Sequence, residues 1–269
     1  MTDSITMSPV TLLGVPLDEN SSFARGPAAA PAAIRAALAS SHGHRTTELG
    51  INLNAAPWID GGDIDVDGAE PMAAIEAAAG AVAAGGRKLL ALGGDHSVSA
   101  PLIKAAAAKH GQLTVFHIDA HPDLYADFEG NPHSHASPFA RALEAGAIKR
   151  LVQVGIRTLN ATLSAEVRKY GVEVVTMRDW PRNVTSDLRG PLYVSVDLDG
   201  LDPAFAPGVS HPEPGGLSTR EVIRMLQDLP VSPVAADIVE LNPFRDINGM
   251  TAFVAAKCLK ELMGRMLEG

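Results

Sequence analysis

The sequence predicts an α/β fold in which a mainly parallel central sheet carries helices on both faces, within a single domain spanning residues 1–269. Two observations lead to this prediction. Short apolar runs alternate with alanine-rich stretches along the whole chain, as expected when parallel strands are joined by crossover helices. The apolar runs are also nearly continuous, without a polar residue at every second position, which indicates strands that are covered on both faces.

Seven apolar runs of strand length are expected to form the sheet. Most are rich in Val, Ile or Leu, and several end in Gly, Asp or His. No regular structure is predicted for residues 43–67, which contain Pro57 and the pair Gly61–Gly62. The expected strands are Val10–Leu17, Lys88–Leu92, Leu113–Ile118, Arg150–Gly155, Val172–Thr176, Pro191–Val196 and Val234–Val239.

Seven helices are expected to follow these strands. Alanine-rich stretches such as Ala28–Ala33 and Ala77–Ala84 favour helix over disorder. Ser218 and Glu221 match the capping box that begins a helix. The expected helices are Ala28–Ser40, Pro71–Ala84, Ser99–His110, Ser137–Ala145, Ser164–Tyr170, Thr219–Leu229 and Met250–Leu267.

Composition and charge exclude several classes of protein. Hydrophobic residues make up 46% of the 269 residues, enough for a sizeable core, and no run reaches the roughly 18 unbroken apolar residues of a membrane span. The stretch Met1–Val10 has no signal-peptide pattern, and a single cysteine, Cys258, excludes a disulfide within the chain. We therefore expect a cytoplasmic protein. The net charge of −9 argues against a nucleic-acid partner, which needs clustered Lys and Arg.

Three polar clusters each begin where an apolar run ends. They are Gly-Gly-Asp-His-Ser at 93–97, Asp-Ala-His-Pro-Asp at 119–123 and Ser-Val-Asp-Leu-Asp-Gly-Leu-Asp-Pro at 195–203. In open α/β sheets, ligands bind in the crevice at the C-terminal ends of the strands. The three clusters are therefore expected to meet in one cleft, although they lie far apart in the chain.

The spacing within the clusters predicts a metal site. Residues two apart on an extended chain point to the same side. The cluster at 119–123 can therefore direct three ligands at one ion or at two adjacent ions, and the cluster at 195–203 can direct two. A further histidine follows the Gly-Gly turn, where the backbone can approach closely. The candidate ligands are His96, Asp119, His121, Asp123, Asp197 and Asp199.

The donor types in this set narrow the choice of metal. Four carboxylates in one cleft repel one another unless cations lie among them. With no thiolate, the set suits Mn²⁺ better than a structural Zn²⁺, and it holds more histidine than a typical Ca²⁺ or Mg²⁺ site. Taken singly, an Asp-x-Asp pair is usually a turn or surface feature, and a histidine after Gly-Gly is usually a turn residue. The occurrence of all three clusters at strand ends favours the metal site.

These clusters resemble the motifs of the ureohydrolase family, which includes arginases, agmatinases and guanidinobutyrases. The family motifs Gly-Gly-Asp-His-Ser, Asp-Ala-His-x-Asp and Ser-x-Asp-x-Asp-x-x-Asp-Pro occur in the same order here, and the resemblance runs from Leu13 to Leu262. It is nearest to the plant-type arginases. The stretches that resemble that branch are 14–17, 20–23, 134–137, 206–211 and 246–252.

The resemblance implies an arginase-like three-layer αβα fold with two Mn²⁺ ions per subunit. The six candidate ligands would hold these ions, and one of them, Asp123, would also be needed for catalysis. Some aspartates would bridge both ions, which would activate a water for attack on the guanidinium carbon. Glu240 would grip the guanidinium through paired hydrogen bonds. His135 would pass a proton to the leaving amine. By spacing alone, Glu240 is an ordinary acid at a strand end, His135 is a loop histidine, and Asp202 supports Asp199 or its turn.

The expected reaction is hydrolysis of a small cationic guanidino compound to urea and an amine. L-Arginine, giving ornithine, is the first candidate substrate; agmatine, giving putrescine, is a close second, and guanidinobutyrate is third. Residues 155–160 lack the acid that contacts the α-amino group of the substrate in animal-type arginases, and His211 stands where many members have threonine. Asn131 and His211 are the candidate contacts to the rest of the substrate. The resemblance also suggests a homotrimer or homohexamer.

Two alternatives belong to other functional classes. Deacetylases have a related α/β fold, but a one-metal deacetylase would not need both the 119–123 cluster and His96. A non-catalytic metal-binding or regulatory protein is the other alternative, and the intact ligand set together with Glu240 argues against it. Metal retention without urea release would favour it again.

Overall fold

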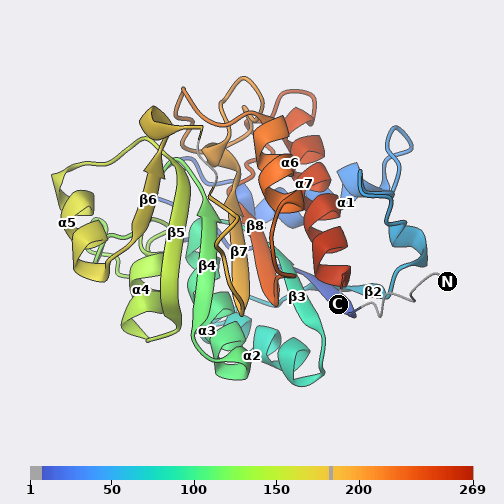
Figure 1. The fold of residues 1–269 in the computed structure, drawn as a ribbon, viewed down its shortest axis with the longest axis horizontal. Coiled ribbons are helices and arrows are strands. Elements are labelled where there is room, and N and C mark those ends of the chain that lie inside the picture. Colours follow the sequence, from blue (N-terminus) through green and yellow to red (C-terminus); the bar gives the residue numbers. More distant parts are fainter. Residues whose placement is uncertain (1–7, 182–183, 269) are drawn as a thin grey trace.

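A single sheet of eight parallel strands forms the centre of the computed structural model, which describes residues 8–181 and 184–268 (Figure 1). The order across the sheet is β2-β1-β3-β8-β7-β4-β5-β6. Every pairing between neighbouring strands is parallel. The strands are β1 (Val10–Gly14), β2 (Trp58–Asp63), β3 (Lys88–Leu92), β4 (Leu113–Ile118), β5 (Ile148–Ile156), β6 (Glu173–Thr176), β7 (Leu192–Asp197) and β8 (Ala235–Val239).

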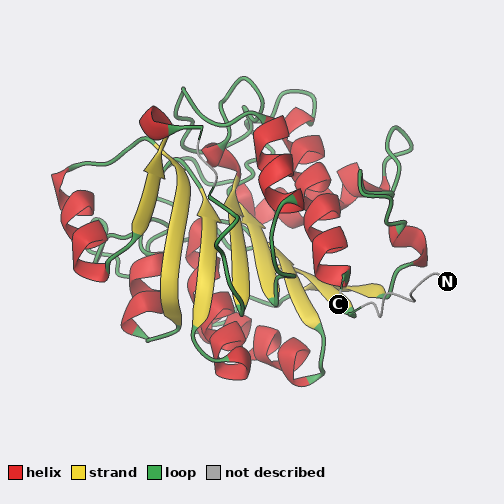
Figure 2. Cartoon of the chain, in the orientation of Figure 1, coloured by secondary structure: helices red, strands yellow, loops and turns green. Residues whose placement is uncertain are grey.

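Helices cover both faces of this sheet (Figure 2). The core on one face contains apolar residues of α1, α6 and α7, and the core on the other face contains those of α2, α3, α4 and α5. This confirms the predicted three-layer α/β domain. The helices are α1 (Ala30–Ala39), α2 (Pro71–Ala84), α3 (Ser99–His110), α4 (Pro138–Glu144), α5 (Ala161–Tyr170), α6 (Thr219–Gln227) and α7 (Met250–Leu267).

Local sequence signals set several element boundaries. At the start of α6, Ser218 Oγ accepts a hydrogen bond from the backbone N–H of Glu221, and the Glu221 carboxylate accepts one from the backbone N–H of Ser218 at 2.8 Å. The predicted capping box is therefore present. All seven predicted strands and all seven predicted helices are found, with ends that differ by a few residues. The largest differences are three residues: β1 ends at Gly14 and not at Leu17, and α5 begins at Ala161 and not at Ser164.

The eighth strand, β2, lies in the segment 43–67, for which no regular structure was predicted. It is the edge strand next to β1, and five of its six residues are exposed. The guanidinium of Arg35 in α1 binds Asp60 at 2.8 Å and also contacts Asp63. A strand that is exposed at an edge needs no apolar run, so hydrophobicity does not reveal it.

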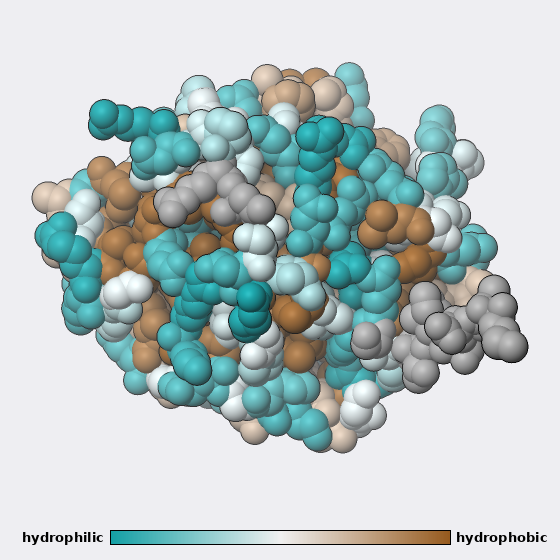
Figure 3. Space-filling model, viewed as in Figure 1, coloured by the Kyte–Doolittle hydropathy of each residue, from teal (hydrophilic) through white to brown (hydrophobic). Residues whose placement is uncertain are grey.

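The surface is predominantly polar. On the face in Figure 3, hydrophilic side chains surround scattered hydrophobic patches, as expected when charged residues make up 20% of the chain. None of the helices in the described part of the chain is long and apolar enough to cross a membrane.

Candidate functional site

The four central strands β3, β8, β7 and β4 are consecutive neighbours in the sheet, and each ends beside a predicted site residue. His96 follows β3, Asp119 follows β4, Asp197 ends β7 and Glu240 follows β8. All four side chains are buried. The predicted meeting of the clusters at the C-terminal edge of the sheet is confirmed.

Close backbone packing places His96. A Cβ atom on Gly94 would overlap the carbonyl oxygen of Leu17, so only glycine fits at this point of the turn. The adjoining Asp95 carboxylate accepts the backbone N–H groups of Ser97 and Asn20 at 3.0 and 2.9 Å. His96 is thereby held in the short 3-10 helix between β3 and α3.

The first group of candidate ligands surrounds the Nδ1 atom of His96. Carboxylate oxygens of Asp123, Asp197 and Asp119 lie 2.9, 3.1 and 3.3 Å from this nitrogen. The nitrogen is buried and has no hydrogen-bond partner among the described residues. A buried polar atom without a partner is costly, so this nitrogen needs a ligand.

A hydrogen-bond chain behind His96 determines what that ligand is. Asp237 accepts hydrogen bonds from the hydroxyls of Ser195, Tyr193 and Ser99 at 2.6, 2.6 and 2.7 Å. Since the Ser195 proton points to Asp237, the Ser195 oxygen must accept the Nε2–H of His96, 3.0 Å away. In the neutral imidazole, the Nδ1 atom of His96 then carries a lone pair aimed at three carboxylates. A cation fits among these four atoms.

The second group of candidate ligands adjoins the first. His121 Nδ1 lies 3.1 Å from an Asp199 oxygen and 3.4 Å from Asp119 Oδ1. Asp119 therefore contributes one carboxylate oxygen to each group, and it is the residue that the two groups share. Two adjacent cation sites with a bridging carboxylate follow from this geometry.

The charges within these groups are poorly compensated by protein atoms alone. Burial and the carboxylates of Asp199 and Asp119 raise the pKa of Asp197 well above its usual range. Burial likewise raises the pKa of Asp199 to about 7, against the opposing effect of His121. Bound divalent cations would relieve this repulsion.

The expected reason for the convergence of Asp119, His121 and Asp123 is wrong in one respect. Strand β4 ends at Ile118, and the chain then turns instead of staying extended. Asp123 has a φ of 49° and Glu240 a φ of 66°, both in the left-handed region that residues other than glycine rarely adopt. The turn of the chain therefore directs Asp123 into the first group and His121 into the second. The two residues with a left-handed backbone, Asp123 and Glu240, both lie at the site.

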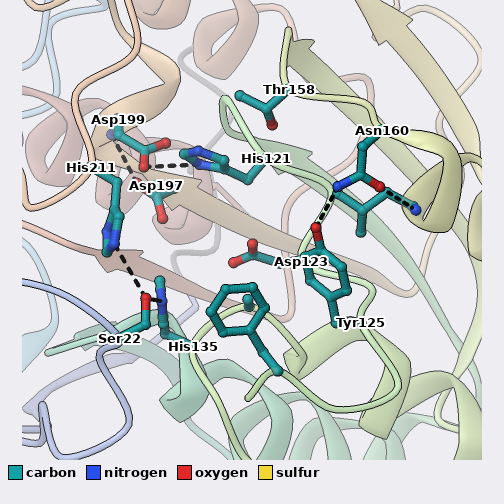
Figure 4. Close-up of a pocket in the computed structure, with 13 residues that line it drawn as sticks. Ser22, His121, Asp123, Tyr125, His135, Thr158, Asn160, Asp197, Asp199 and His211 are labelled. Atoms are coloured by element: carbon teal, nitrogen blue, oxygen red, sulfur yellow. Dashed lines mark hydrogen bonds and ion pairs between the residues drawn. The ribbon is translucent and has the colours of Figure 1, made fainter.

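A cavity of about 300 Å³ opens onto these groups (Figure 4). Asp197, Asp199 and His121 lie on one side of the view, with His135, His211 and Ser22 below them and Tyr125 and Asn160 opposite. The acidic side chains that line the cavity are all candidate metal ligands. They are Asp123, Asp197 and Asp199.

His135, Glu240 and His211 form a third polar group at this cavity. His135 Nδ1 lies 3.5 Å from Glu240 Oε1, and its Nε2 lies 2.8 Å from Ser22 Oγ. The His211 ring stacks on His135 with 4.8 Å between centroids, and its Nε2 lies 3.4 Å from the same hydroxyl. Burial lowers the pKa of His135, but the Glu240 carboxylate outweighs this and raises it to about 9. Burial and the His135 charge lower the pKa of His211.

Glu240 is held in place from the other side as well. Its Oε1 atom accepts the backbone N–H of His96 at 2.8 Å. The contact to His135 outweighs burial and lowers the pKa of Glu240. Glu240 therefore stays a carboxylate, ready to accept further hydrogen bonds.

The structure does not bring Asn131 into the cavity. The Asn131 amide donates to Asn20 Oδ1 at 3.0 Å, and its carbonyl oxygen accepts the backbone N–H of His133 at 2.9 Å. Its polar atoms are thus engaged outside the cavity. Asp202 accepts the backbone N–H groups of Gly215 and Gly216 at 2.6 and 3.1 Å, so it supports a turn, one of its two expected roles.

Tyr125 and Asn160 are among the cavity residues that were not predicted. Asn160 caps α5 through its Oδ1 atom, which accepts the N–H of Leu163 at 2.9 Å. That contact orients the amide nitrogen of Asn160 to the Tyr125 hydroxyl, 2.6 Å away. Because this oxygen accepts a hydrogen bond, the Tyr125 proton is available to a molecule in the cavity. The position of Tyr125, two residues after Asp123, is the sequence signal that identifies it.

A buried polar row under the site was also missed. Gln153, His117, Ser195 and Asp237 are register partners on four neighbouring strands. The amide nitrogen of Gln153 lies 3.1 Å from His117 Nδ1 and 2.7 Å from the carbonyl oxygen of Pro122. His117 Nε2 lies 2.8 Å from Asp119 Oδ2. Polar residues inside apolar strands are the signal for this row.

The chain is similar to known proteins over nearly its whole length. The model of the arginase family matches residues 8–264. The mitochondrial arginase of Medicago truncatula is 44% identical over 95% of this chain and 81% of that protein. Proclavaminate amidinohydrolase of Streptomyces clavuligerus is 34% identical over 94% of this chain and 87% of that protein. The solved structure of the Medicago truncatula arginase superposes with a TM-score of 0.91 at 43% identity, covering 97% of this chain and 88% of that one.

Proposed function

Because this chain belongs to the arginase family, a family of hydrolases that act on guanidino compounds, we propose that it hydrolyses L-arginine to urea and ornithine. The observation that carries the proposal is the composition of the cavity. The two groups of candidate metal ligands line one side of it. The Tyr125 hydroxyl lies on the other side, with no acidic side chain beside it among the described residues that line the cavity.

The two groups around Asp119 are proposed to hold two Mn²⁺ ions. His96, Asp119, Asp123 and Asp197 form one group, and Asp119, His121 and Asp199 form the other. Their oxygen-rich donor set with one imidazole each suits Mn²⁺. Bound there, the ions supply an activated water at neutral pH and offset the four aspartates.

The residues beside the cation groups are proposed to bind and protonate the substrate. Glu240 is a buried carboxylate with a free oxygen, so it accepts hydrogen bonds from the guanidinium of the substrate. His135 holds a proton at neutral pH, because its pKa is raised to about 9 after the opposing effect of burial. It donates this proton to the amine as that group leaves. His211, whose pKa is lowered, stacks on His135 and contacts the rest of the substrate.

The far side of the cavity favours a substrate with a carboxylate. The proton of Tyr125 is free because Asn160 donates to its oxygen. Among the described residues, the acids that line the cavity are candidate metal ligands, so the ammonium end of agmatine would find no opposite charge at the far side. The carboxylate of arginine or of guanidinobutyrate would instead accept the Tyr125 hydroxyl.

Urea release by the manganese-loaded protein, with arginine, agmatine and guanidinobutyrate compared side by side, tests the proposal. We expect arginine to have the highest kcat/KM. Tyr125→Phe should raise the KM for arginine roughly 10- to 100-fold, the effect of one hydrogen bond to a charged group, and leave the KM for agmatine unchanged. Tyr170→Phe, which removes a surface hydroxyl bound to Glu144, is the matched control.

Other outcomes would select the other functions. A higher kcat/KM for agmatine or guanidinobutyrate would make the protein an agmatinase or a guanidinobutyrase. Metal retention without urea from any of the three would favour a non-catalytic metal-binding protein. A homotrimer or homohexamer is proposed from the resemblance of the sequence, and a cytoplasmic location from its composition, which includes a single cysteine.

A further inference from the structure

We propose that His135, His211 and Glu240 form a third cation site, selective for zinc-like ions, whose occupation excludes the guanidino substrate. One ligand atom from each of the three side chains lies within 4.8 Å of the other two. None of the three belongs to the two groups around Asp119. The site overlaps the substrate position, so its effect on turnover rests on the proposed function.

The donor set of this third site differs from that of the other two. Two imidazoles and one glutamate form a ligand set typical of zinc, with one position left open. The two groups around Asp119 that are proposed to hold Mn²⁺ have one imidazole each and are richer in carboxylate; His96, His117 and Asp119 also lie close together, but this set shares His96 and Asp119 with the first of those groups. Nitrogen-rich sites prefer Zn²⁺ over Mn²⁺. The chain therefore offers two kinds of cation site within one cavity.

The geometry needs little rearrangement to accept an ion. Ligands on one tetrahedral zinc lie about 3.4 Å apart, given a Zn–N distance of about 2.1 Å. His135 Nδ1 and Glu240 Oε1 are already 3.5 Å apart. Ser22 Oγ lies on the other side of the His135 ring, 2.8 Å from its Nε2, and 3.4 Å from the Nε2 of His211. A water from the cavity can complete the coordination.

The charges around the site also fit a third ion. Two divalent ions in the groups around Asp119 would offset the four aspartates there. Glu240 and the fully buried Asp95 then remain beside the stacked histidines, with the protonated His135 as the positive charge next to Glu240. A divalent ion that replaces the His135 proton would offset both carboxyl groups.

Access and competition follow from the position of the site. His135 and His211 line the cavity and are partly exposed, so an ion can reach them from solvent. The ion would occupy the Glu240 oxygen that the guanidinium needs and the nitrogen of His135 that carries the proton. Ion and substrate therefore cannot bind together, and inhibition should be competitive.

The first test measures metal content without turnover. The manganese-loaded protein is dialysed against Zn²⁺, and both metals are counted by mass spectrometry. We expect one zinc per chain with both manganese ions retained. His211→Asn should abolish the zinc uptake and keep the manganese. His133→Asn changes an exposed histidine of the loop that contains His135, and it should bind zinc like the unchanged protein.

Three results would overturn the proposal: zinc that displaces manganese, zinc uptake unchanged in His211→Asn, or zinc uptake lost in His133→Asn. If His211→Asn does not fold, His135→Asn tests the same site. In the second test, Zn²⁺ should raise the KM for arginine and leave kcat unchanged. A protein that binds the third ion but releases no urea would contradict the proposed function and leave the site standing.

Discussion

Removal of the Ser195 hydroxyl should weaken metal binding without any change to a ligand. Ser195 accepts the Nε2–H of His96 at 3.0 Å and donates to Asp237 at 2.6 Å. In Ser195→Ala the Nε2–H is left buried without an acceptor. The imidazole can then recover a hydrogen bond only by carrying its proton on Nδ1, the atom that faces the carboxylates. Loss of such a partner of a metal-binding histidine typically costs 10- to 100-fold in metal affinity, or about 1.4–2.7 kcal/mol.

Ser99→Ala is the matched control for this prediction. Ser99 is also buried and donates to the same carboxylate at 2.7 Å. Its hydrogen bond to His96 runs from the backbone N–H to the His96 carbonyl oxygen, which Ser99→Ala keeps. Both variants lose a hydrogen bond to Asp237, so both should be destabilised by about 1–3 kcal/mol. Only Ser195→Ala should bind Mn²⁺ more weakly by calorimetry and need more Mn²⁺ for full urea release. Equal Mn²⁺ affinity in the two variants would refute the role assigned to the hydrogen-bond chain.

The remaining predictions concern the shared carboxylate and the charged pair at the cavity. Asp119→Asn should lower the metal content to less than one ion per chain, because both groups lose a carboxylate oxygen. Asp199→Asn should retain the ion of the first group. Counting the metal ions per chain distinguishes the two variants, and equal losses would contradict the bridging role of Asp119. Glu240→Gln should lower the pKa of His135 from about 9, because the carboxylate that favours the imidazolium is gone. Histidine NMR of the metal-free protein checks the shift, and an unchanged midpoint would show that Glu240 does not hold the proton.

Hydrophobic pattern was sufficient to predict most of this fold, because the inner strands are buried on both faces and their apolar runs are unbroken. Strand β2 has no such run. It is stabilised at the edge of the sheet by backbone pairing and by Arg35, and neither contact leaves a periodic pattern in the sequence. Element ends were less accurate because they depend on local turns, as at Gly14.

The metal groups were predictable because ligands follow strands whose ends meet at one edge. Their grouping was not, since it depends on a turn that gives Asp123 a left-handed backbone. Residues that act from a helix cap or from inside a strand were missed. Asn160 and Asp237 have ordinary sequence neighbours, and only the fold brings them to the site. Asn131 was expected to contact the substrate because of its place in the sequence, but its side chain is hydrogen-bonded to Asn20.

The order of strands in the sheet has a consequence for synthesis of the chain. Strand β8 comes last in the sequence, yet it lies between β3 and β7 and joins the two halves of the sheet. A nascent chain on the ribosome can pair β1 with β3, and β4 with β7, but no strand pairing joins those two halves until residues 235–239 emerge. His96 lies on one half and Asp119 on the other. Metal binding must therefore wait until nearly the whole chain has been synthesised. A messenger RNA truncated before the codons of β8 would yield a protein with neither a complete core nor a metal site.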